Sequence, residues 1–315
     1  MEAAGGKVRP LEITVLTGGP SSEREVSLDS GRAVAEALRR CGHHVTAADI
    51  SPDDTSALGR AGLDAVFIAL HGAFGEDGQV QRLCEARGLT YVGSGPDASQ
   101  RAMDKDASKR TFRQAGLATP DWALIEASQT ASQRADAAAG VPPPCVVKPV
   151  DSGSSVDVYV ARDGEAQAEA LELLLDKYGR AMIETFISGR EVTVSVLGRQ
   201  PLPVLEIRPA EEFYNYRAKY SDDRTEYLVN PDLPPAVTRN LQAAGLKAHQ
   251  VLGCRDFSRV DFILDGNAVP WVLEVNTIPG FTSHSLLPKA AAAAGISFEQ
   301  LCDRIVRLAM DRSGR

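Results

Sequence analysis

Two pairs of polar residues near the end of the chain suit phosphate chemistry. Arg259 and Asp261 lie two residues apart in the run SRVDFIL, and Glu274 and Asn276 lie two apart in WVLEVNTIPG. Side chains two apart on a strand point to the same face, so each pair projects together. If the two strands pair, three oxygen donors and one guanidinium converge, as binding of Mg²⁺ with nucleotide phosphates requires. For either pair alone, an edge hairpin with solvated charges is the alternative.

Two lysines are candidates for binding the same phosphates. Lys148 ends the apolar run CVVKP and precedes DSGSS, whose N–H and hydroxyl groups suit phosphate oxygens. The order Gly-Lys-Ser/Thr of a Walker A loop is absent. Lys105, in MDKDASK, is a candidate second phosphate ligand. A solvated turn and a surface helix lysine are the alternative interpretations.

A strand-turn-strand pattern, IETFISGREVTV, carries Glu184 and Glu191. A purine pocket here would use the backbone of residues 185–187 for the base edge and Glu191 for the ribose hydroxyls. An amphipathic hairpin is the other interpretation. The irregular polar segment 211–227, which contains Lys219 and Tyr220, is long enough to cover a substrate.

Three further candidates suit an amino acid substrate. Glu23, in the loop GGPSSERE, could bind an ammonium group, although a capping box of Ser22 and Glu25 explains it nearly as well. His71 follows an apolar strand and precedes a Gly-rich turn. Ser285 stands at the start of a helix, where it could bind a carboxylate or cap the helix.

The elements that must position these residues alternate between strand and helix in the first third of the chain. We predict strands over 11–17, 43–50 and 64–70 and helices over 26–41 and 79–87. This order predicts a parallel, doubly wound sheet with ligands beyond the carboxyl ends of its strands. A boundary is expected at 93–99. After it we expect a hairpin over 142–160, strands over 121–126, 181–187 and beyond 191, and helices over 104–115, 164–177, 285–294 and 297–311. The Ala-rich segment 127–140 is either a helix or a loose surface stretch.

Length and composition are those of a soluble globular protein with two or three domains. The 315 residues are 43% hydrophobic and 24% charged, and the net charge of −8 argues against a general nucleic-acid or membrane binder. The absence of a long apolar run and of a signal peptide predicts a cytoplasmic protein. Five cysteines without a Cys-x-x-Cys motif predict reduced, buried or half-buried thiols.

Taken in order, the motifs resemble those of the D-alanine–D-alanine ligases of the ATP-grasp superfamily over residues 11–311. They are GGPSSEREVS, ALHGAFGEDG, MDK, VVKP-x-x-SGSSV, IETFISGRE, AKY, RVDFILD and LEVNTIPGFTSHSLLP. The resemblance implies an α/β ATP-grasp fold with an α+β C-terminal part. Its implied domains are an N-terminal Rossmann-like doubly wound parallel sheet domain (1–96), a central ATP-grasp subdomain (97–187) and a C-terminal subdomain with the metal and substrate site (188–315).

The resemblance also implies the reaction and the residues that serve it. A cytoplasmic homodimer would join two D-alanines, through a D-alanyl phosphate, for peptidoglycan synthesis. ATP would be bound by Lys105, Lys148, Ser154, Ser155, Glu184, Phe186, Ile187, Glu191 and Lys219. Two Mg²⁺ ions, which Mn²⁺ could replace, would be held by Asp261, Glu274 and Asn276. Substrate would contact Glu23, His71, Arg259, Gly280, Ser285 and Leu286, and the catalytic set would be Glu23, Ser154, Tyr220, Arg259 and Gly280.

Two positions depart from the pattern of the family. Asp157 follows Val156 where the family normally has glycine, which puts a negative side chain at a phosphate loop. Thr185 stands where the family often has lysine, so that one contact to the base is in doubt. A D-alanine–D-lactate ligase, another ATP-grasp carboxylate–amine ligase and a catalytically silent nucleotide-binding module are the rival interpretations. The AKY segment with Tyr220 favours the dipeptide-forming branch.

Overall fold

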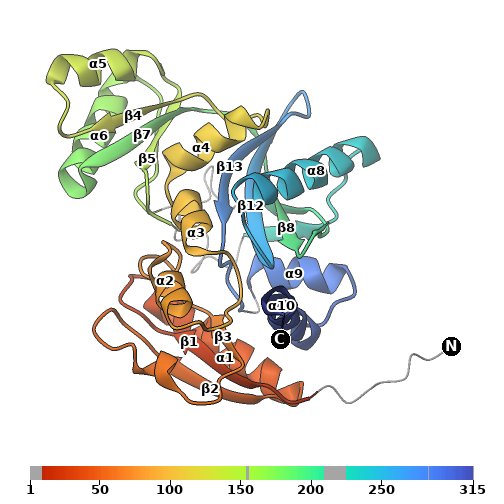
Figure 1. Ribbon diagram of the computed structural model, residues 1–315. Coiled ribbons are helices and arrows are strands. Elements are labelled where there is room, and N and C mark those ends of the chain that lie inside the picture. The colour runs from red at the N-terminus through yellow and green to blue at the C-terminus, as the bar shows by residue number, and fades with distance from the viewer. Residues whose placement is uncertain (1–8, 154–155, 209–224, 283, 315) are drawn as a thin grey trace. The chain divides into compact units, whose positions relative to one another are not determined.

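The computed structural model describes residues 9–153, 156–208, 225–282 and 284–314, whose elements are labelled in Figure 1. The chain divides into two compact units. One extends to Pro96 and includes the chain from Ile278 onward, and the other is Asp97–Thr277. The division after Pro96 falls within the predicted boundary at 93–99. The separation of a central from a C-terminal subdomain at 187/188 stays a prediction.

The first unit is built on a parallel sheet with strand order β2-β1-β3. Its strands are β1 (Glu12–Thr17), β2 (His44–Asp49) and β3 (Ala65–Ile68), and Tyr91 adds a parallel bridge to Val66. The side chains of β3 are all buried, as expected of a parallel strand covered by helices. The unit contains the helices α1 (Arg24–Arg40), η1 (Ser56–Gly59), α2 (Gln79–Ala86), α9 (Leu286–Ala293) and α10 (Phe298–Ser313). The predicted parallel sheet with its helices is confirmed.

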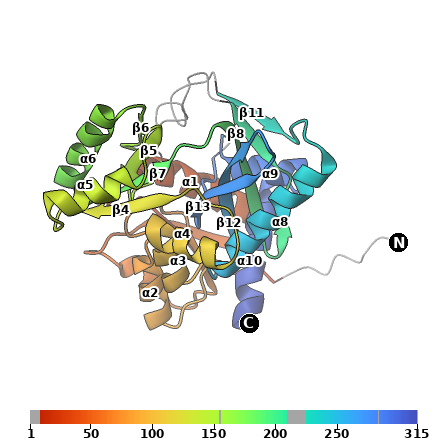
Figure 2. The ribbon, with the colours of Figure 1, turned by 90° about the horizontal axis from the view of Figure 1, so that it is seen from above.

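One of the two sheets of the second unit is antiparallel, with order β4-β7-β5-β6. The strands are β4 (Trp122–Glu126), β5 (Cys145–Pro149), β6 (Tyr159–Ala161) and β7 (Arg180–Thr185). Helices α5 (Ala131–Ala139) and α6 (Gly164–Tyr178) cover one face, where Val147 and Ile183 belong to the core (Figure 2). Because side chains alternate along a strand, Lys148 and Glu184 project from the opposite face.

The other sheet of this unit has six strands, with order β11-β10-β8-β12-β13 and β9 paired to β8. Its strands are β8 (Gly189–Leu197), β9 (Gln200–Pro201), β10 (Leu205–Arg208), β11 (Glu226–Val229), β12 (Phe257–Asp265) and β13 (Pro270–Asn276). Helix α8 (Pro235–Val251) packs against β8, β12 and β13 (Figure 2). The core includes Val192, Val194, Val260 and Phe262. The polar residues that alternate with these lie on the other face of the sheet.

Two helices of the second unit are absent from the sequence-based prediction. The predicted helix near 104–115 is α4 (Lys105–Gln114), but α3 (Pro96–Met103) precedes it. Proline is well tolerated in the first turn of a helix, so Pro96 begins this helix rather than marking a loop. Helix α8 also begins at a proline and buries Leu241, Ala244 and Ala248 along one face.

Two expectations from composition can be compared with the described residues. None of the helices in these parts of the chain is both long and apolar enough to cross a membrane. All five cysteines have free thiols, and Cys84, Cys145, Cys254 and Cys302 are buried as predicted. The prediction was wrong for Cys41, which is exposed because it follows the last turn of α1.

Candidate active site

A solvent-open pocket of about 870 Å³ lies in the second unit, between residues of its two sheets. Apolar side chains of Val146, Val158, Ile263 and Leu273 contribute to its lining. The pocket gathers eight of the residues that the sequence predicted for nucleotide and metal binding: Lys105, Lys148, Glu184, Phe186, Ile187, Glu191, Asp261 and Glu274.

The two predicted carboxylates of the metal site are neighbours across a strand pair. Strands β12 and β13 are antiparallel, with Asp261 opposite Glu274 and Arg259 opposite Asn276. The Arg259 guanidinium donates two hydrogen bonds to Asp261, Nε to Oδ1 at 2.8 Å and Nη2 to Oδ2 at 2.7 Å. Lys105 Nζ lies 3.4 Å from Glu274 Oε2. Each carboxylate therefore faces a cation of the protein itself.

A β-bulge decides which face of β13 carries the acidic residue. Opposite Asp261 and Phe262, the partner residues change from Glu274 to Val272, so Leu273 is extra. As a result Val272 and Val275, three residues apart, are both buried, while Leu273 and Glu274 line the pocket. Strict alternation would have placed Glu274 on the same side as Val272.

The lysines reach the pocket from a helix and a strand. Lys105 is the first residue of α4, and its Nζ donates to the carbonyl oxygen of Ser152 at 2.6 Å. Lys148 is the last residue but one of β5, and its Nζ donates to Glu184 Oε1 at 3.0 Å. Glu184 sits on β7, diagonally across from Lys148, because Lys148 pairs with Met182 and Glu184 with Val146. Both lysines are more than nine-tenths buried, so the surface-lysine and solvated-turn alternatives are wrong for these side chains.

The predicted base edge, residues 185–187, follows directly after β7. The N–H of Thr185 donates to the carbonyl oxygen of Asp121 at 2.8 Å, and that of Phe186 to the carbonyl oxygen of Pro144 at 3.3 Å. Since both of these N–H groups already have partners, Phe186 would contact the base through its backbone carbonyl oxygen. Thr185, the departure from the family pattern, is among the residues that line the pocket.

Asp157, the other departure, adopts a left-handed backbone conformation with φ of 55°. This is the region that glycine occupies readily and that Asp tolerates better than most residues. Its carboxylate accepts hydrogen bonds from Lys177 Nζ at 2.6 Å and from the Tyr178 hydroxyl. The Lys177 hydrogen bond, followed by that of Tyr178, lowers the pKa of Asp157. The negative charge is thus directed toward the end of α6.

The first unit gathers predicted substrate residues from two loops that are far apart in sequence. The N-cap of α1 is Glu23 rather than Ser22, and its side chain makes no capping hydrogen bond, so the interpretation as a capping box of Ser22 and Glu25 is wrong. A Cβ atom placed on Gly72 would be 3.0 Å from Glu23 Oε2, so the turn after His71 lies against this carboxylate. The Ser21 hydroxyl donates to the His71 carbonyl at 2.7 Å and ties the two loops together.

The C-terminal predicted residues lie in the same unit. His71 Nε2 is 3.2 Å from Ser30 Oγ, which accepts a hydrogen bond from the Phe281 N–H at 3.3 Å. A Cβ on Gly280 would lie only 2.6 Å from Ser285 Oγ, so the turn at Gly280 packs closely against this hydroxyl. Ser285 precedes α9, yet its hydroxyl makes no cap and instead contacts Thr282. The capping interpretation of Ser285 is therefore wrong as well.

Some predicted residues are not placed by this geometry. Ser154, Ser155, Lys219 and Tyr220 lie outside the described residues, so their roles stay predictions. Asn276 lies two residues after Glu274 at the end of β13 and is half-buried, but it does not belong to the pocket lining. Leu286, the first residue of α9, has a buried side chain, which leaves its backbone for the predicted carboxylate contact.

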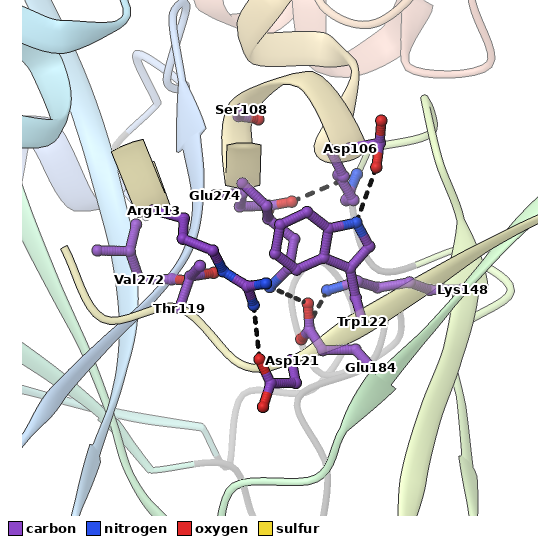
Figure 3. Close-up of polar contacts among 12 residues, drawn as sticks. Asp106, Ser108, Arg113, Thr119, Asp121, Trp122, Lys148, Glu184, Val272 and Glu274 are labelled. Atoms are coloured by element: carbon purple, nitrogen blue, oxygen red, sulfur yellow. Dashed lines mark hydrogen bonds and ion pairs between the residues drawn. The ribbon is translucent and has the colours of Figure 1, made fainter. Parts of the chain in front are cut away.

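One charged residue beside the pocket was missed by the sequence analysis. Lys109 is fully buried, and its Nζ lies 2.6 Å from Glu184 Oε2. Figure 3 shows the surrounding group, in which Glu184 lies near Lys148, Trp122 and Thr119. A signal did exist, since Lys109 follows Lys105 by four residues and so lies on the same side of α4.

Two sheets that face one pocket, with lysines and Glu184 on one side and acidic residues on the other, define an α/β fold of the ATP-grasp class. Residues 54–94 match the family described as D-ala D-ala ligase N-terminus, and residues 111–307 match D-ala D-ala ligase C-terminus. The chain belongs to the D-alanine–D-alanine ligase family. A D-alanine–D-alanine ligase of Synechococcus sp. (strain JA-2-3B'a(2-13)) is 45% identical over 96% of this chain and 94% of the relative.

Solved structures agree with this assignment. The D-alanine–D-alanine ligase of Bacillus anthracis complexed with ATP has a TM-score of 0.83 and 32% identity, covering 96% of this chain and 99% of its own. The VanG D-Ala:D-Ser ligase of Enterococcus faecalis has a TM-score of 0.84 and 27% identity, covering 96% and 100%. The predicted α/β fold is confirmed, whereas the choice of acceptor among such relatives depends on the substrate site.

Proposed function

We propose that this protein uses ATP to join two D-alanines into D-alanyl-D-alanine through a D-alanyl phosphate. The observation that carries the proposal is the placement of Asp261 beside Glu274 in a pocket also lined by Lys148 and Glu184. The names of the relatives, D-alanine–D-alanine ligases at 43–45% identity, support it. The product fits synthesis of peptidoglycan precursors.

The pocket offers separate groups to each part of ATP. Phe186, Ile187 and the apolar side chains suit the base, and Glu191 suits the ribose hydroxyls. Lys105 and Lys148 suit the phosphates, together with the predicted Ser154, Ser155 and Lys219. Because both lysines already face carboxylates, nucleotide binding exchanges one anionic partner for another.

The acidic pair fits a divalent cation by its donor chemistry. Asp261 and Glu274 offer hard carboxylate oxygens on adjacent strand positions, and Asn276 adds an amide oxygen two residues further along. We assign these three residues to two Mg²⁺ ions, which Mn²⁺ could replace. When bound, the ions would offset the negative charge of the triphosphate. Arg259 and Lys105 face these carboxylates in the structure, so they would turn to other partners.

The first step makes the carboxyl group of one D-alanine reactive. A carboxylate is a poor electrophile, so its oxygen forms a bond to the γ-phosphorus of ATP and ADP leaves. Lys105 and Lys148 would stabilise the charge on the transferred group, because phosphoryl transfer depends mainly on positioning and electrostatics. Glu23 would hold the ammonium group of this first D-alanine, and His71 would border the same site.

The second step forms the peptide bond. The deprotonated amine of the second D-alanine attacks the acyl carbon, and inorganic phosphate leaves from the tetrahedral intermediate. We assign Arg259 and the Gly280 N–H as donors to the oxyanion, and Ser285 with the Leu286 backbone as partners of the second carboxylate. A hydrogen-bonded set of Glu23, Ser154 and Tyr220 would keep water from the acyl phosphate. We further propose a cytoplasmic homodimer.

A phosphate-release assay tests the function. The purified protein is given ATP and Mg²⁺ with D-alanine, L-alanine, D-alanine plus D-lactate, D-alanine plus D-serine, or no acceptor, and products are identified by mass spectrometry. We expect release that requires D-alanine, formation of the dipeptide, and loss of turnover on chelation with EDTA. Preferential formation of a mixed product with D-lactate or D-serine would contradict the proposed acceptor. ATP binding without turnover would contradict the enzyme assignment.

A further inference from the structure

Behind the pocket, Lys109 occupies a fixed and fully enclosed position. Its Nζ donates to Thr119 Oγ1 at 2.7 Å. The Thr119 hydroxyl donates its own hydrogen bond to the Val272 carbonyl at 2.8 Å, so toward Lys109 it can act only as an acceptor. A fully buried ammonium group with such a directed partner is not arranged to bind solvent or a surface ion.

An aromatic residue holds the lysine from another side. Lys109 Nζ lies 5.2 Å from the centre of the Trp122 ring, within the range of a cation–π contact. The indole N–H of Trp122 donates to Asp106 Oδ1 at 2.8 Å, and the Arg113 guanidinium lies 4.3 Å from the ring centre (Figure 3). Arg113 in turn pairs with Asp121 at 2.6 Å. The position of the ammonium group is therefore determined by α4 and by the strand that begins at Trp122.

Glu184 shares its two oxygens between two lysines that differ in access. Oε1 accepts a hydrogen bond from Lys148, which lines the pocket, while Oε2 is 2.6 Å from Lys109, which lies behind it. The Oε2 contact is a close ion pair outside hydrogen-bond angles. Among the described residues, this buried oxygen receives no hydrogen bond. This carboxylate of the pocket lining is thus held from behind the pocket by the charge of Lys109.

Binding of a nucleotide would affect Lys148 and Lys109 differently. The phosphates attract Lys148, the accessible cation, and would leave Glu184 without its Oε1 partner. A buried carboxylate without a counter-ion takes up a proton, and its acid form donates rather than accepts a hydrogen bond. Lys109 cannot follow the phosphates, because Thr119 and Trp122 enclose it, so it stays with Glu184.

We propose that Lys109 is a positioning residue that keeps Glu184 ionised, so that Glu184 accepts from the 6-amino group of adenine and the site rejects 6-oxo purines. This inference rests on the proposed function, because it takes ATP as the nucleotide. An acceptor such as ionised Glu184 meets the amino group of adenine favourably. It meets the carbonyl oxygen of hypoxanthine or guanine with repulsion between two acceptors.

The electrostatics of the cluster agree with this role. Burial alone would raise the pKa of Glu184, but the charges of Lys109 and Lys148 outweigh burial and lower it. Burial lowers the pKa of Lys109 to about 8, against the opposing charge of Glu184, with Lys148 and Arg113 as the other cations that face it. Removal of Lys109 therefore removes one of the two charges that keep Glu184 ionised.

The test measures binding and use of ATP and of ITP, its 6-oxo analogue, by wild type and Lys109→Met. We expect the preference for ATP, as the ratio of dissociation constants and of kcat/KM, to fall by at least about tenfold, since a site with an altered buried donor or acceptor loses discrimination. The Kd of the variant for ATP should also improve as pH rises and Glu184 loses its proton. A preference within about twofold of wild type would overturn the inference.

Further variants keep the test decisive if Lys109→Met folds poorly. Thr119→Val retains the lysine but removes its acceptor, and we expect a smaller fall in preference. In the Glu184→Gln background, adding Lys109→Met should change the preference by less than about twofold, because the two residues act together. An equal fall in both backgrounds would contradict action through Glu184. Lys247→Met, the same substitution at an exposed lysine of α8, is the matched control and should leave the preference unchanged.

These binding measurements separate the inference from the proposed function. Nucleotide preference is read without any amino acid present, so it remains measurable if the protein joins substrates other than D-alanine. Normal ligation of D-alanine by a Lys109→Met protein with unchanged preference would overturn the inference alone.

Discussion

The pocket of the second unit and the substrate residues of the first unit are held in place by different forces. In the pocket, described ion pairs join Lys105 to Glu274, Lys148 to Glu184 and Arg259 to Asp261. In the first unit, the described contacts around His71 and Ser285 are hydrogen bonds from hydroxyls and backbone groups, such as Ser21 to the His71 carbonyl.

This difference suits the ligands that we propose for each unit. A buried charge that lacks a partner is costly, so a pocket meant for phosphates and metal ions keeps its charges paired until the ligand replaces those partners. A small amino acid carries one positive and one negative group. Its binding depends more on hydrogen bonds of defined direction than on a strong electrostatic field from several charged residues. The two regions should therefore respond differently to mutation and to pH.

The largest effect should come from Arg259, which pairs with Asp261 of the pocket lining and which we assign to the reaction. Arg259→Ala should lower kcat by about 10²–10³-fold, as expected for loss of a donor to an oxyanion. ATP affinity should stay within a few fold, because Asp261 remains available to a metal ion. Steady-state kinetics and calorimetric titration with ATP measure the two quantities.

Arg190 provides a matched control for that variant. Arg190 Nε and Nη2 donate to Glu206 at 2.8 and 2.7 Å, nearly the same double contact that Arg259 makes with Asp261, but neither residue belongs to the pocket lining. Arg190→Ala should therefore leave kcat within about twofold, as for a residue outside the site. Equal loss of ATP affinity and kcat in Arg259→Ala would instead indicate ground-state binding.

The second unit should also be sensitive to acid through a buried histidine. Burial lowers the pKa of His249 to about 4, from 6.5, so between these values the unfolded chain binds a proton that the folded chain does not. Stability is fully present above pH 6.5 and is lost as pH falls toward 4, by about 2–3 kcal/mol.

Urea unfolding at pH 7 and pH 4.5 checks this contribution. His249→Gln should lose less stability than wild type between the two pH values, and exposed His44→Gln should behave like wild type. An unchanged pH dependence in His249→Gln would show that other groups cause the acid sensitivity.

A smaller effect, confined to amino acid binding, should follow from Ser30 in the first unit. Ser30→Ala removes the partner of His71 and of the Phe281 N–H, and a lost hydrogen bond of this kind corresponds to about a fivefold increase in KM for D-alanine. KM for ATP should not change. Ser99→Ala removes a buried hydroxyl that has no partner among the described residues, and it should leave both KM values unchanged.

The smallest effect should come from Asp157, at the margin of the pocket. Asp157→Asn keeps a residue type that tolerates positive φ but removes the charge that pairs with Lys177, so KM for ATP should rise by about two- to fivefold. Asp157→Gly, the residue usual in the family, tests the backbone alone. A lower KM in Asp157→Asn would show that the negative charge opposes ATP after all.

Much of this site could be predicted because its patterns are local. Alternation along strands placed Arg259 with Asp261 and Glu274 with Asn276, and the observed strand pairing brings the two pairs together. Apolar runs before Lys148 and His71 likewise indicated strands that end at a site. Helix α8 was missed although its spacing of buried residues was present, because the sequence around it was interpreted as strands.

By itself, the sequence determined the family, the parallel sheet and the residue types that face the nucleotide, since these depend on spacing along one segment. Only the tertiary structure decided that Leu273 bulges and turns Glu274 toward the pocket, and that Lys109 is enclosed while Lys105 lines the cavity. Burial of a lysine depends on what packs against its helix, and Thr119 and Trp122 come from a later segment of the chain. Contacts between residues of distant segments do not follow the regular spacing by which a sequence pattern reveals a helix or a strand.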